Sequence, residues 1–196
     1  MAMDTKGKKI ILASGSPRRK ELLAALDLEF TVDTGNTFEE RYSPDTPHTK
    51  VPEVMSVGKS HGFHRPLEDD EILVTSDTMV LCGDEIMGKP KDREDAVRML
   101  KMLSDREHQV ITAVTIRSNA REKTFSDTAE VFFKKLTDEE INYYIDTYRP
   151  FDKAGAYGIQ EWIGYVGISR LEGSFFNVMG FPTQRFYEEF QEFLKD

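Results

Sequence analysis

Three adjacent cations, Arg18, Arg19 and Lys20, are the first residues in the sequence whose types and spacing suggest chemistry. They follow Ser16 and Pro17, which suit the N-cap and the first position of a helix. A helix N-terminus already carries about half a positive charge and free backbone N–H groups, so three cations are unfavourable there unless an anion joins them. Phosphate fits, because helix N-termini and arginine side chains both bind it. The plainer interpretation is that the three side chains are solvated on an exposed turn.

Asp77 is the first carboxylate that the pattern singles out. It stands in Ser76-Asp77-Thr78, which interrupts an apolar stretch typical of a strand. A half-buried aspartate needs a cation, a metal or several hydrogen bonds, although it can also simply bond a neighbouring turn. Lys89 follows the returning strand of the same expected hairpin. We therefore expect Lys89 on the side where the strand of Asp77 begins, not far from the carboxylate.

Three further polar residues are weaker candidates on composition alone. Glu40 lies in a long polar loop, where binding groups are common but solvated acids are commoner. Lys59 stands near the end of an expected helix, which is an ordinary place for a cation. Gln160 belongs to the loop 152–161, whose small residues would allow either a close approach to a ligand or a tight surface connection. The four histidines do not show the spacing of metal ligands.

The totals exclude several classes of protein. A formal net charge of −9 argues against non-specific binding of nucleic acid. The single cysteine, Cys82, excludes an internal disulfide and is expected to be buried and inert, which fits a reducing compartment. The polar residues 1–9 precede an apolar run too short for a signal peptide or a membrane span, so a cytoplasmic location is the default. We expect one domain over residues 1–196, with residues 1–9 as a flexible lead.

Hydrophobic periodicity predicts an α/β fold with a mixed sheet. The expected helices cover residues 17–26, 52–61, 92–103 and 183–194, together with a segment from Thr137 to Pro150. The expected strands cover 10–13, 28–32, 71–80 with an interruption at 76–78, 86–87, 109–116 and 123–135. Residues 33–52 are expected to form a long loop. Residues 163–171 and 175–179 are expected to form a hairpin around Glu172-Gly173.

Several segments together resemble the Maf family of nucleoside triphosphate pyrophosphatases. In chain order they are LASGSPRRKELL, an acidic pair in the following loop, a lysine near a helix end, VTSDTMV, GKP, TAEVFF, DKAGAYGIQ and GSFFNVMGFP. The resemblance runs from about Ile10 to Tyr187. It implies an elongated mixed β-sheet flanked by helices, with two lobes and a central cleft, as in the inosine triphosphatase type of fold.

The resemblance also implies a reaction and a set of residues. A nucleoside triphosphate would be hydrolysed to the monophosphate and pyrophosphate with a divalent metal, Mg²⁺ or Mn²⁺. The implied site residues are Ser14, Arg18, Arg19, Glu40, Lys59, Asp77 and Lys89. Asp77 and Glu40 would hold the metal, Asp77 would orient or deprotonate the attacking water, and Lys59 and Lys89 would neutralise the leaving pyrophosphate.

Selectivity and partners follow from the same resemblance. The set Arg19, Thr78 and Gln160 resembles the branch of the family that acts on dTTP and UTP, with Gln160 reading the uracil or thymine edge. A homodimer is implied, with neither nucleic acid nor membrane as a partner. Two alternatives stay open: a nucleotide- or partner-binding regulator of cell division without relevant turnover, and a phosphatase of monoesters.

Two departures from the family pattern are visible. Lys59 stands in Gly-Lys-Ser where relatives more often show Glu-Lys-Ala, which bears on the helix around it. Glu161-Trp162 follows Gln160 where relatives often have small residues, which bears on the shape of the base pocket.

Overall fold

The computed structural model describes residues 3–195 and has an α/β fold. In these residues seven strands form one sheet in the order β2-β1-β3-β5-β6-β7, with β4 paired to β3. The strands are β1 (Lys9–Leu12), β2 (Thr31–Val32), β3 (Glu71–Cys82), β4 (Glu85–Met87), β5 (Glu107–Arg117), β6 (Glu122–Phe133) and β7 (Ile168–Glu172). β1 is parallel to β2 and β3, whereas β4 and β7 are antiparallel to their partners, so the prediction of a mixed sheet is confirmed.

The helices of the described residues flank this sheet. They are α1 (Pro17–Ala24), α2 (Val51–His61), α3 (Arg93–Leu103), α4 (Asp138–Tyr148), α5 (Trp162–Gly167), α6 (Phe175–Met179) and α7 (Thr183–Phe193), with short 3₁₀ helices at His48–Lys50 and Ala154–Ala156. No helix among residues 3–195 is long and apolar enough to cross a membrane.

The chain divides into two compact units. The first comprises Met1–Asp77, Thr112–Asp127 and Gly180–Asp196, and the second comprises Thr78–Ile111 and Thr128–Met179. The divisions fall inside the long strands β3, β5 and β6, each of which contributes residues to both units. The expected single domain and the flexible lead over residues 1–9 stay predictions, although Lys9 already pairs in β1.

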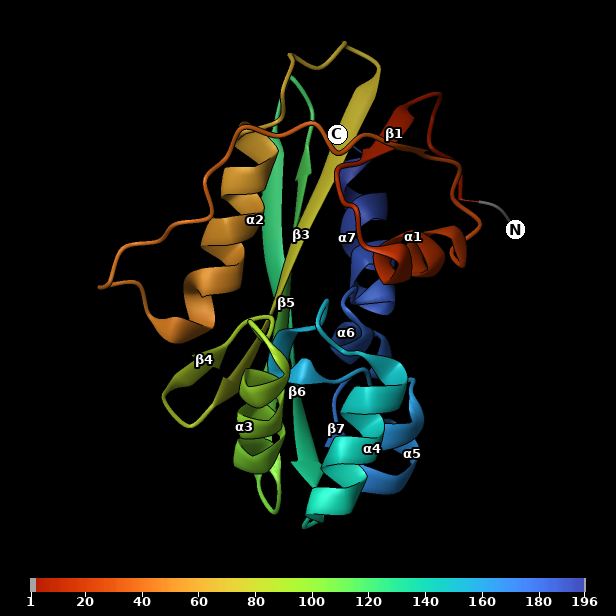
Figure 1. Ribbon diagram of the computed structural model, residues 1–196. Coiled ribbons are helices and arrows are strands. Elements are labelled where there is room, and N and C mark those ends of the chain that lie inside the picture. Colours follow the sequence, from red (N-terminus) through yellow and green to blue (C-terminus); the bar gives the residue numbers. More distant parts are fainter. Residues whose placement is uncertain (1–2, 196) are drawn as a thin grey trace. The chain divides into compact units, whose positions relative to one another are not determined.

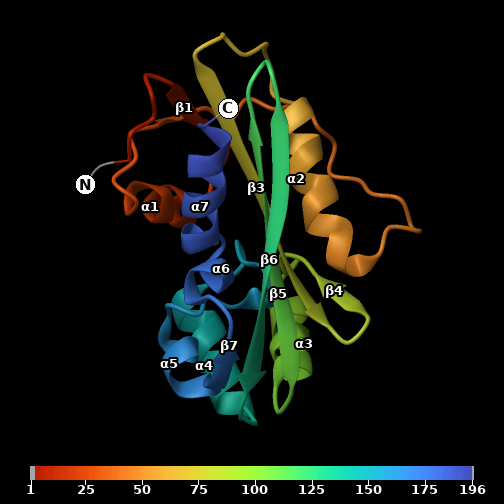
Figure 2. The same cartoon turned by 180° about the vertical axis from the view of Figure 1, so that it is seen from behind.

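In the first unit, α2 lies on one side of the strands and α1 and α7 lie on the other (Figures 1 and 2). α7 forms because Phe186, Phe190 and Phe193 recur at helical spacing and are all buried. The rings of Phe186 and Phe190 stack with centroids 5.1 Å apart. α1 begins as predicted, with Ser16 as N-cap and Pro17 in the first turn.

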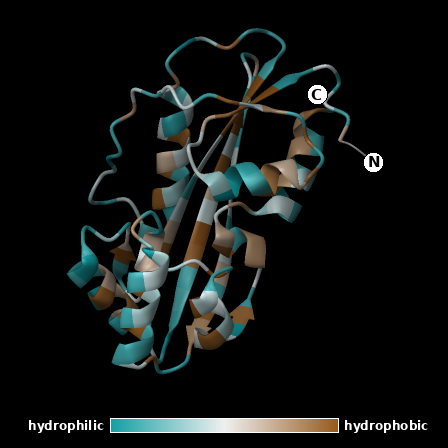
Figure 3. Ribbon diagram, turned by 45° about the vertical axis from the view of Figure 1, so that its right-hand side comes forward, coloured by the Kyte–Doolittle hydropathy of each residue, from teal (hydrophilic) through white to brown (hydrophobic). Residues whose placement is uncertain are grey.

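In the second unit, α3 lies on one side of the strands and α4 and α5 lie on the other (Figures 1 and 2). α4 opens with the predicted capping box, in which Thr137 and Glu140 bond each other's backbone N–H. Its buried residue Tyr144 belongs to a core cluster with Leu100 and Val131. Figure 3 shows hydrophobic residues along the strands and on parts of the helices, while the loops are largely hydrophilic.

Three expectations about elements were wrong. β3 runs without interruption through Ser76-Asp77-Thr78, because the residues on both sides are buried and a polar side chain does not by itself end an extended segment. Residues 162–167 form α5 and residues 175–179 form α6, so only Ile168–Glu172 of the expected hairpin is a strand. A short apolar run fits a strand or a helix equally well, and both of these segments are helical in the structure. The strand expected over 28–32 contains only Thr31–Val32.

Candidate active site

Arg19 is fixed at the start of α1 by acceptors from three other segments. Its Nε donates to the carbonyl of Gly180 at 3.0 Å, and its Nη1 donates to the carbonyl of Ser76 at 3.0 Å and to Ser14 Oγ at 3.4 Å. The backbone N–H of Arg19 also bonds the N-cap hydroxyl of Ser16. The strand, turn and helix at residues 9–24 thus place Arg19 and Ser14 beside the residue that precedes Asp77.

The electrostatics of Arg19 connect the basic helix start to two carboxylates. Loss of solvent around the guanidinium lowers the pKa of Arg19, the charges of Asp77 and Glu40 oppose this effect, and the charge of Arg18 adds to it. The charges of Arg18, Asp77 and Glu40 thus all act on the Arg19 guanidinium. The guanidinium of Arg19 is directed at the segment of Asp77 and not at bulk solvent.

Lys59 joins the two candidate carboxylates. Its Nζ donates to Asp77 Oδ1 at 2.6 Å and lies 3.0 Å from Glu40 Oε1. The side chains of Lys59 and Asp77 are 20% and 19% exposed, whereas that of Glu40 is 64% exposed. One half-buried ammonium thus holds together residues from α2, β3 and the loop 33–52. Neither a free helix-end cation nor an isolated loop acid describes this arrangement.

Glu40 reaches Lys59 because its loop is anchored on the end of α2. Asn36 Nδ2 donates to the carbonyl of Lys59 at 2.6 Å, and the backbone N–H of Thr37 donates to the carbonyl of Gly62. The ring of Phe38 occupies the space that a side chain at position 58 would need, since a Cβ at Gly58 would lie 2.2 Å from Phe38 Cζ. The glycine therefore lets the loop pack against α2.

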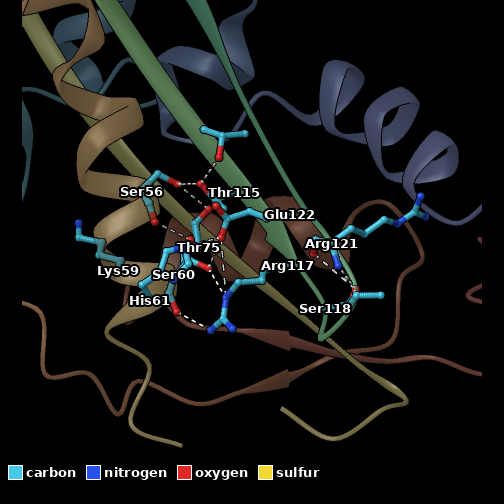
Figure 4. A network of polar contacts seen from close by, with 12 residues as sticks. Ser56, Lys59, Ser60, His61, Thr75, Thr115, Arg117, Ser118, Arg121 and Glu122 are labelled. Atoms are coloured by element: carbon cyan, nitrogen blue, oxygen red, sulfur yellow. Dashed lines mark hydrogen bonds and ion pairs between the residues drawn. The ribbon is translucent and has the colours of Figure 1, made fainter. Parts of the chain in front are cut away.

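Two reciprocal buried hydrogen bonds between Ser56 and Thr75, which we call the clasp, join α2 to β3 close to the ion pair of Lys59 and Asp77. Ser56 Oγ donates to the carbonyl of Thr75 at 3.2 Å, and Thr75 Oγ1 donates to the carbonyl of Ser56 at 2.8 Å. Ser56 also contacts Thr115 Oγ1 at 2.9 Å, as Figure 4 shows. Ser56 precedes Lys59 by three residues on one helix face, and Thr75 precedes Asp77 by two on one strand face. The clasp thus sets the register in which lysine and aspartate meet.

A second polar cluster fixes the end of α2. Arg117 of β5 donates through Nε to Ser60 Oγ at 2.8 Å and through Nη2 to the carbonyl of Ser60 at 2.6 Å. Glu122 lies 2.9 Å from His61 Nε2. In Figure 4 Lys59 projects away from this cluster. Sequence reasoning missed both clusters. The only signal for them was the presence of small hydroxyl residues on the apolar faces of α2 and β3.

The remaining candidates, Thr78, Lys89 and Gln160, belong to the second unit. Thr78 follows Asp77 in β3 and is half-buried, and Lys89 is exposed. Val80 pairs with Met87, so Thr78 and Lys89 each lie two residues beyond that pair at the same end of the hairpin. The backbone N–H of Gly155 bonds the carbonyl of Gly88 at 3.1 Å, which joins the loop 152–161 to this end.

The side chain of Gln160 has an unusual acceptor. Its Oε1 is buried and has no hydrogen-bond partner among residues 3–195. Buried acceptors are rarely left unpaired, so such an atom is a candidate for contact with a ligand donor. A uracil or thymine N3–H is a donor of this kind.

Comparisons with known proteins identify the family. Residues 9–193 match the family described as "Maf-like protein". The chain belongs to the Maf family. A Parabacteroides distasonis relative named "dTTP/UTP pyrophosphatase" is 47% identical over 98% of this chain and 100% of its own length. A Porphyromonas gingivalis relative with the same name is 46% identical over 98% of both chains. A solved HAM1 protein structure from Coxiella burnetii has a TM-score of 0.48 at 12% identity, over 94% of this chain and 99% of its own.

One departure from the Maf pattern now has a structural reason. Gly58 leaves α2 intact over Val51–His61, so Gly-Lys-Ser does not break the helix of this Maf protein. It provides room for Phe38, whose loop carries Glu40 to Lys59.

Proposed function

We propose that this Maf protein hydrolyses dTTP and UTP to the nucleoside monophosphate and pyrophosphate. The names of relatives 44–47% identical over most of the chain support this substrate class. The observation that carries the proposal is the contact of Lys59 with both Asp77 and Glu40, beside the arginine-bearing start of α1. Cations and carboxylates in one place are what phosphoryl chemistry on a polyanion requires.

Each residue has a role in the proposed reaction. Arg18 and Arg19 bind phosphate oxygens, and Ser14 orients Arg19. Lys59 and Lys89 neutralise the charge of the leaving pyrophosphate, which a triphosphate needs because it carries close to four negative charges. Asp77 orients the attacking water or accepts its proton. Arg19, Thr78 and Gln160 select the base, and the amide of Gln160 can both donate to and accept from a uracil edge.

The donor set fits a divalent metal. No group of three metal-ligating side chains stands among residues 3–195, but Mg²⁺ usually takes only one or two carboxylates and completes its shell with waters and phosphates. Asp77 and Glu40 already converge on one cation, the Lys59 ammonium. We propose that these two carboxylates hold Mg²⁺ or Mn²⁺. A bound metal would neutralise phosphate charge and polarise the phosphoryl group.

Replacing Asp77 by asparagine tests the reaction. We expect Asp77→Asn to lower the rate of pyrophosphate release from UTP by about a thousandfold, because the amide cannot accept the water proton. Thermal unfolding should show a folded variant, and an Asp84→Asn variant in the exposed turn of the hairpin serves as the control. Near-native rates for Asp77→Asn would remove this residue from the catalytic set.

The products distinguish the alternatives. Phosphorus NMR of a UTP reaction should show UMP and pyrophosphate, with loss of the reaction in EDTA and recovery with Mg²⁺. A regulator that only binds nucleotide would give no product. A phosphatase of monoesters would release orthophosphate from UMP. We also propose a homodimer in the cytoplasm, which sedimentation of the purified chain and cell fractionation would test.

A further inference from the structure

We propose that Glu161 is a positioning residue for substrate selection, which together with Lys153 and Tyr144 holds the loop that presents Gln160 to the base. The inference rests on the proposed function, because it takes Gln160 as the residue that meets the pyrimidine. Glu161 directly follows Gln160 in the sequence.

Both carboxylate oxygens of Glu161 are engaged, each by a different segment. Oε1 lies 3.1 Å from Lys153 Nζ at the start of the loop, and Oε2 accepts a short hydrogen bond from the hydroxyl of Tyr144 on α4. The same hydroxyl accepts the backbone N–H of Gly158 at 2.9 Å. Glu161 and Tyr144 therefore tie the beginning, the middle and the end of the segment 153–161 to one helix.

The cluster is little exposed to water, so its charges depend on one another. The side chains of Lys153 and Glu161 are 10% and 19% exposed, whereas Asp152, the other partner of Lys153, is 57% exposed. A buried ammonium needs a counter-charge that is not screened by solvent, and Glu161 is the better placed of the two. Burial and the neighbouring Glu161 carboxylate raise the pKa of the Tyr144 hydroxyl, which therefore remains a donor.

Gly158 shows how closely the loop is drawn around this pair. A Cβ at this position would lie 3.0 Å from Lys153 Cε and 3.1 Å from Glu161 Cδ. A side chain at position 158 would therefore crowd both charged side chains. The contacts of Glu161 with Lys153 and Tyr144, and of Tyr144 with Gly158, form a closed ring, which we call the contact ring of the loop. The shape of the loop depends on the Glu161 carboxylate at its end.

Gln160 depends on this ring for its orientation. Its Oε1 has no partner among the described residues that would hold the amide by itself. The backbone on either side, at Gly158 and Glu161, is what the ring fixes. Without the Glu161 carboxylate, the Lys153 ammonium loses its buried partner and the loop gains alternative conformations. We expect the loss of the Glu161 carboxylate to impair base selection and not phosphate binding. Neither Glu161 nor its partners Lys153 and Tyr144 belong to the proposed phosphate-binding residues.

The test compares Glu161→Gln with the wild type on UTP and CTP. The variant keeps the size of the side chain but loses its charge. We expect KM for UTP to rise about tenfold, kcat to change less than about twofold, and the preference for UTP over CTP to fall about tenfold. Glu139→Gln on the exposed first turn of α4 is the matched control and should leave all three unchanged. Tyr144→Phe removes the other half of the ring and should shift the preference in the same direction.

A binding measurement separates this inference from the proposed hydrolase activity. Trp162, the single tryptophan of the chain, directly follows Glu161 and packs on Tyr143 with ring centroids 4.8 Å apart. Its fluorescence reports nucleotide binding without turnover, in EDTA. If the wild type binds UTP selectively in this titration but releases no pyrophosphate when Mg²⁺ is supplied, the hydrolase proposal is wrong, and the titration of Glu161→Gln still decides on Glu161.

The remaining outcomes are equally definite. If the folded Glu161→Gln and Tyr144→Phe variants keep the wild-type preference and KM, Glu161 does not position Gln160. If Glu161→Gln does not fold, Tyr144→Phe alone decides in the same way. If the wild type shows no preference between UTP and CTP, both the base-reading role of Gln160 and the role of Glu161 are wrong.

Discussion

At the scale of single residues, the two carboxylates that share Lys59 differ mainly in their access to water. Asp77 is 19% exposed and Glu40 is 64% exposed, although both lie within 3.0 Å of the same ammonium. Electrostatic interactions weaken as water surrounds a group, so the pair of Lys59 with Asp77 is the stronger of the two. The difference predicts unequal effects of substitution.

We expect Lys59→Ala to lower kcat/KM for UTP by about a hundredfold, because it removes a cation from the transition state and leaves Asp77 without its partner. Glu40→Gln should lower it by about tenfold, because solvent and substrate can compensate at an exposed position. Steady-state pyrophosphate release measures both. Lys50→Ala, in the exposed pair with Glu53, is the control. Equal losses from Lys59→Ala and Glu40→Gln would contradict the ranking by exposure.

At the scale of elements, the contact between α2 and β3 determines whether Lys59 can meet Asp77. The reciprocal bonds of Ser56 and Thr75 link one turn of the helix to one strand position. A helix sliding by one residue would rotate Lys59 by roughly 100° away from the strand, because an α-helix has about 3.6 residues per turn. The clasp therefore protects the geometry of the site as well as the packing of the first unit.

We expect Thr75→Val to lower stability by about 1–3 kcal/mol, because buried groups that bonded the hydroxyl lose their partner. It should also lower kcat for UTP hydrolysis by about fivefold through a misplaced Lys59. Thr75→Ser keeps the hydroxyl and should restore most of kcat. A double-mutant cycle with Ser56→Ala, read by urea unfolding and by kcat, measures the coupling. Additive effects of the two substitutions on kcat would show that the clasp does not act on the site.

The elements also show what the sequence can and cannot predict. The start of α1 and the buried face of α7 were predictable, since caps and helical periodicity are local signals. α5 was not, because its six residues are too few to show a period. The contact of Lys59 with Asp77 was suggested only through the family resemblance. The clasp of Ser56 and Thr75 joins residues 19 positions apart and depends on how α2 docks, which no local pattern encodes.

At the scale of the whole molecule, the candidate residues divide between the two units at one peptide bond. The first unit contains Ser14, Arg18, Arg19, Glu40, Lys59 and Asp77, and the second contains Thr78, Lys89 and Gln160. Because β3 runs through both units, the proposed reacting carboxylate and the first proposed selectivity residue are consecutive in one strand. The same polypeptide segment thus supplies both functions without a linker between them.

The stability of the chain against acid is expected to depend on His108, which is buried in the second unit. Burial lowers the pKa of His108 from 6.5 to about 3. Its Nε2 lies 2.6 Å from the Tyr157 hydroxyl, and its Nδ1 has no partner among residues 3–195. The folded protein therefore holds the ring neutral. Since the unfolded chain binds the proton at an ordinary pKa, acid favours unfolding.

The contribution of the neutral ring is complete above pH 6.5 and is lost as the pH falls toward about 3. Between pH 7 and about pH 4.5 the loss amounts to about 2.5 kcal/mol. The reference is the Tyr157→Phe variant, so that removing His108 leaves no buried hydroxyl without a partner. Urea unfolding at both pH values should show this loss of stability in Tyr157→Phe. The double variant His108→Leu/Tyr157→Phe should not show the part of the loss that His108 causes. Replacing exposed His48 by glutamine should leave the dependence unchanged. A double variant as acid-sensitive as Tyr157→Phe would show that other groups cause the acid sensitivity.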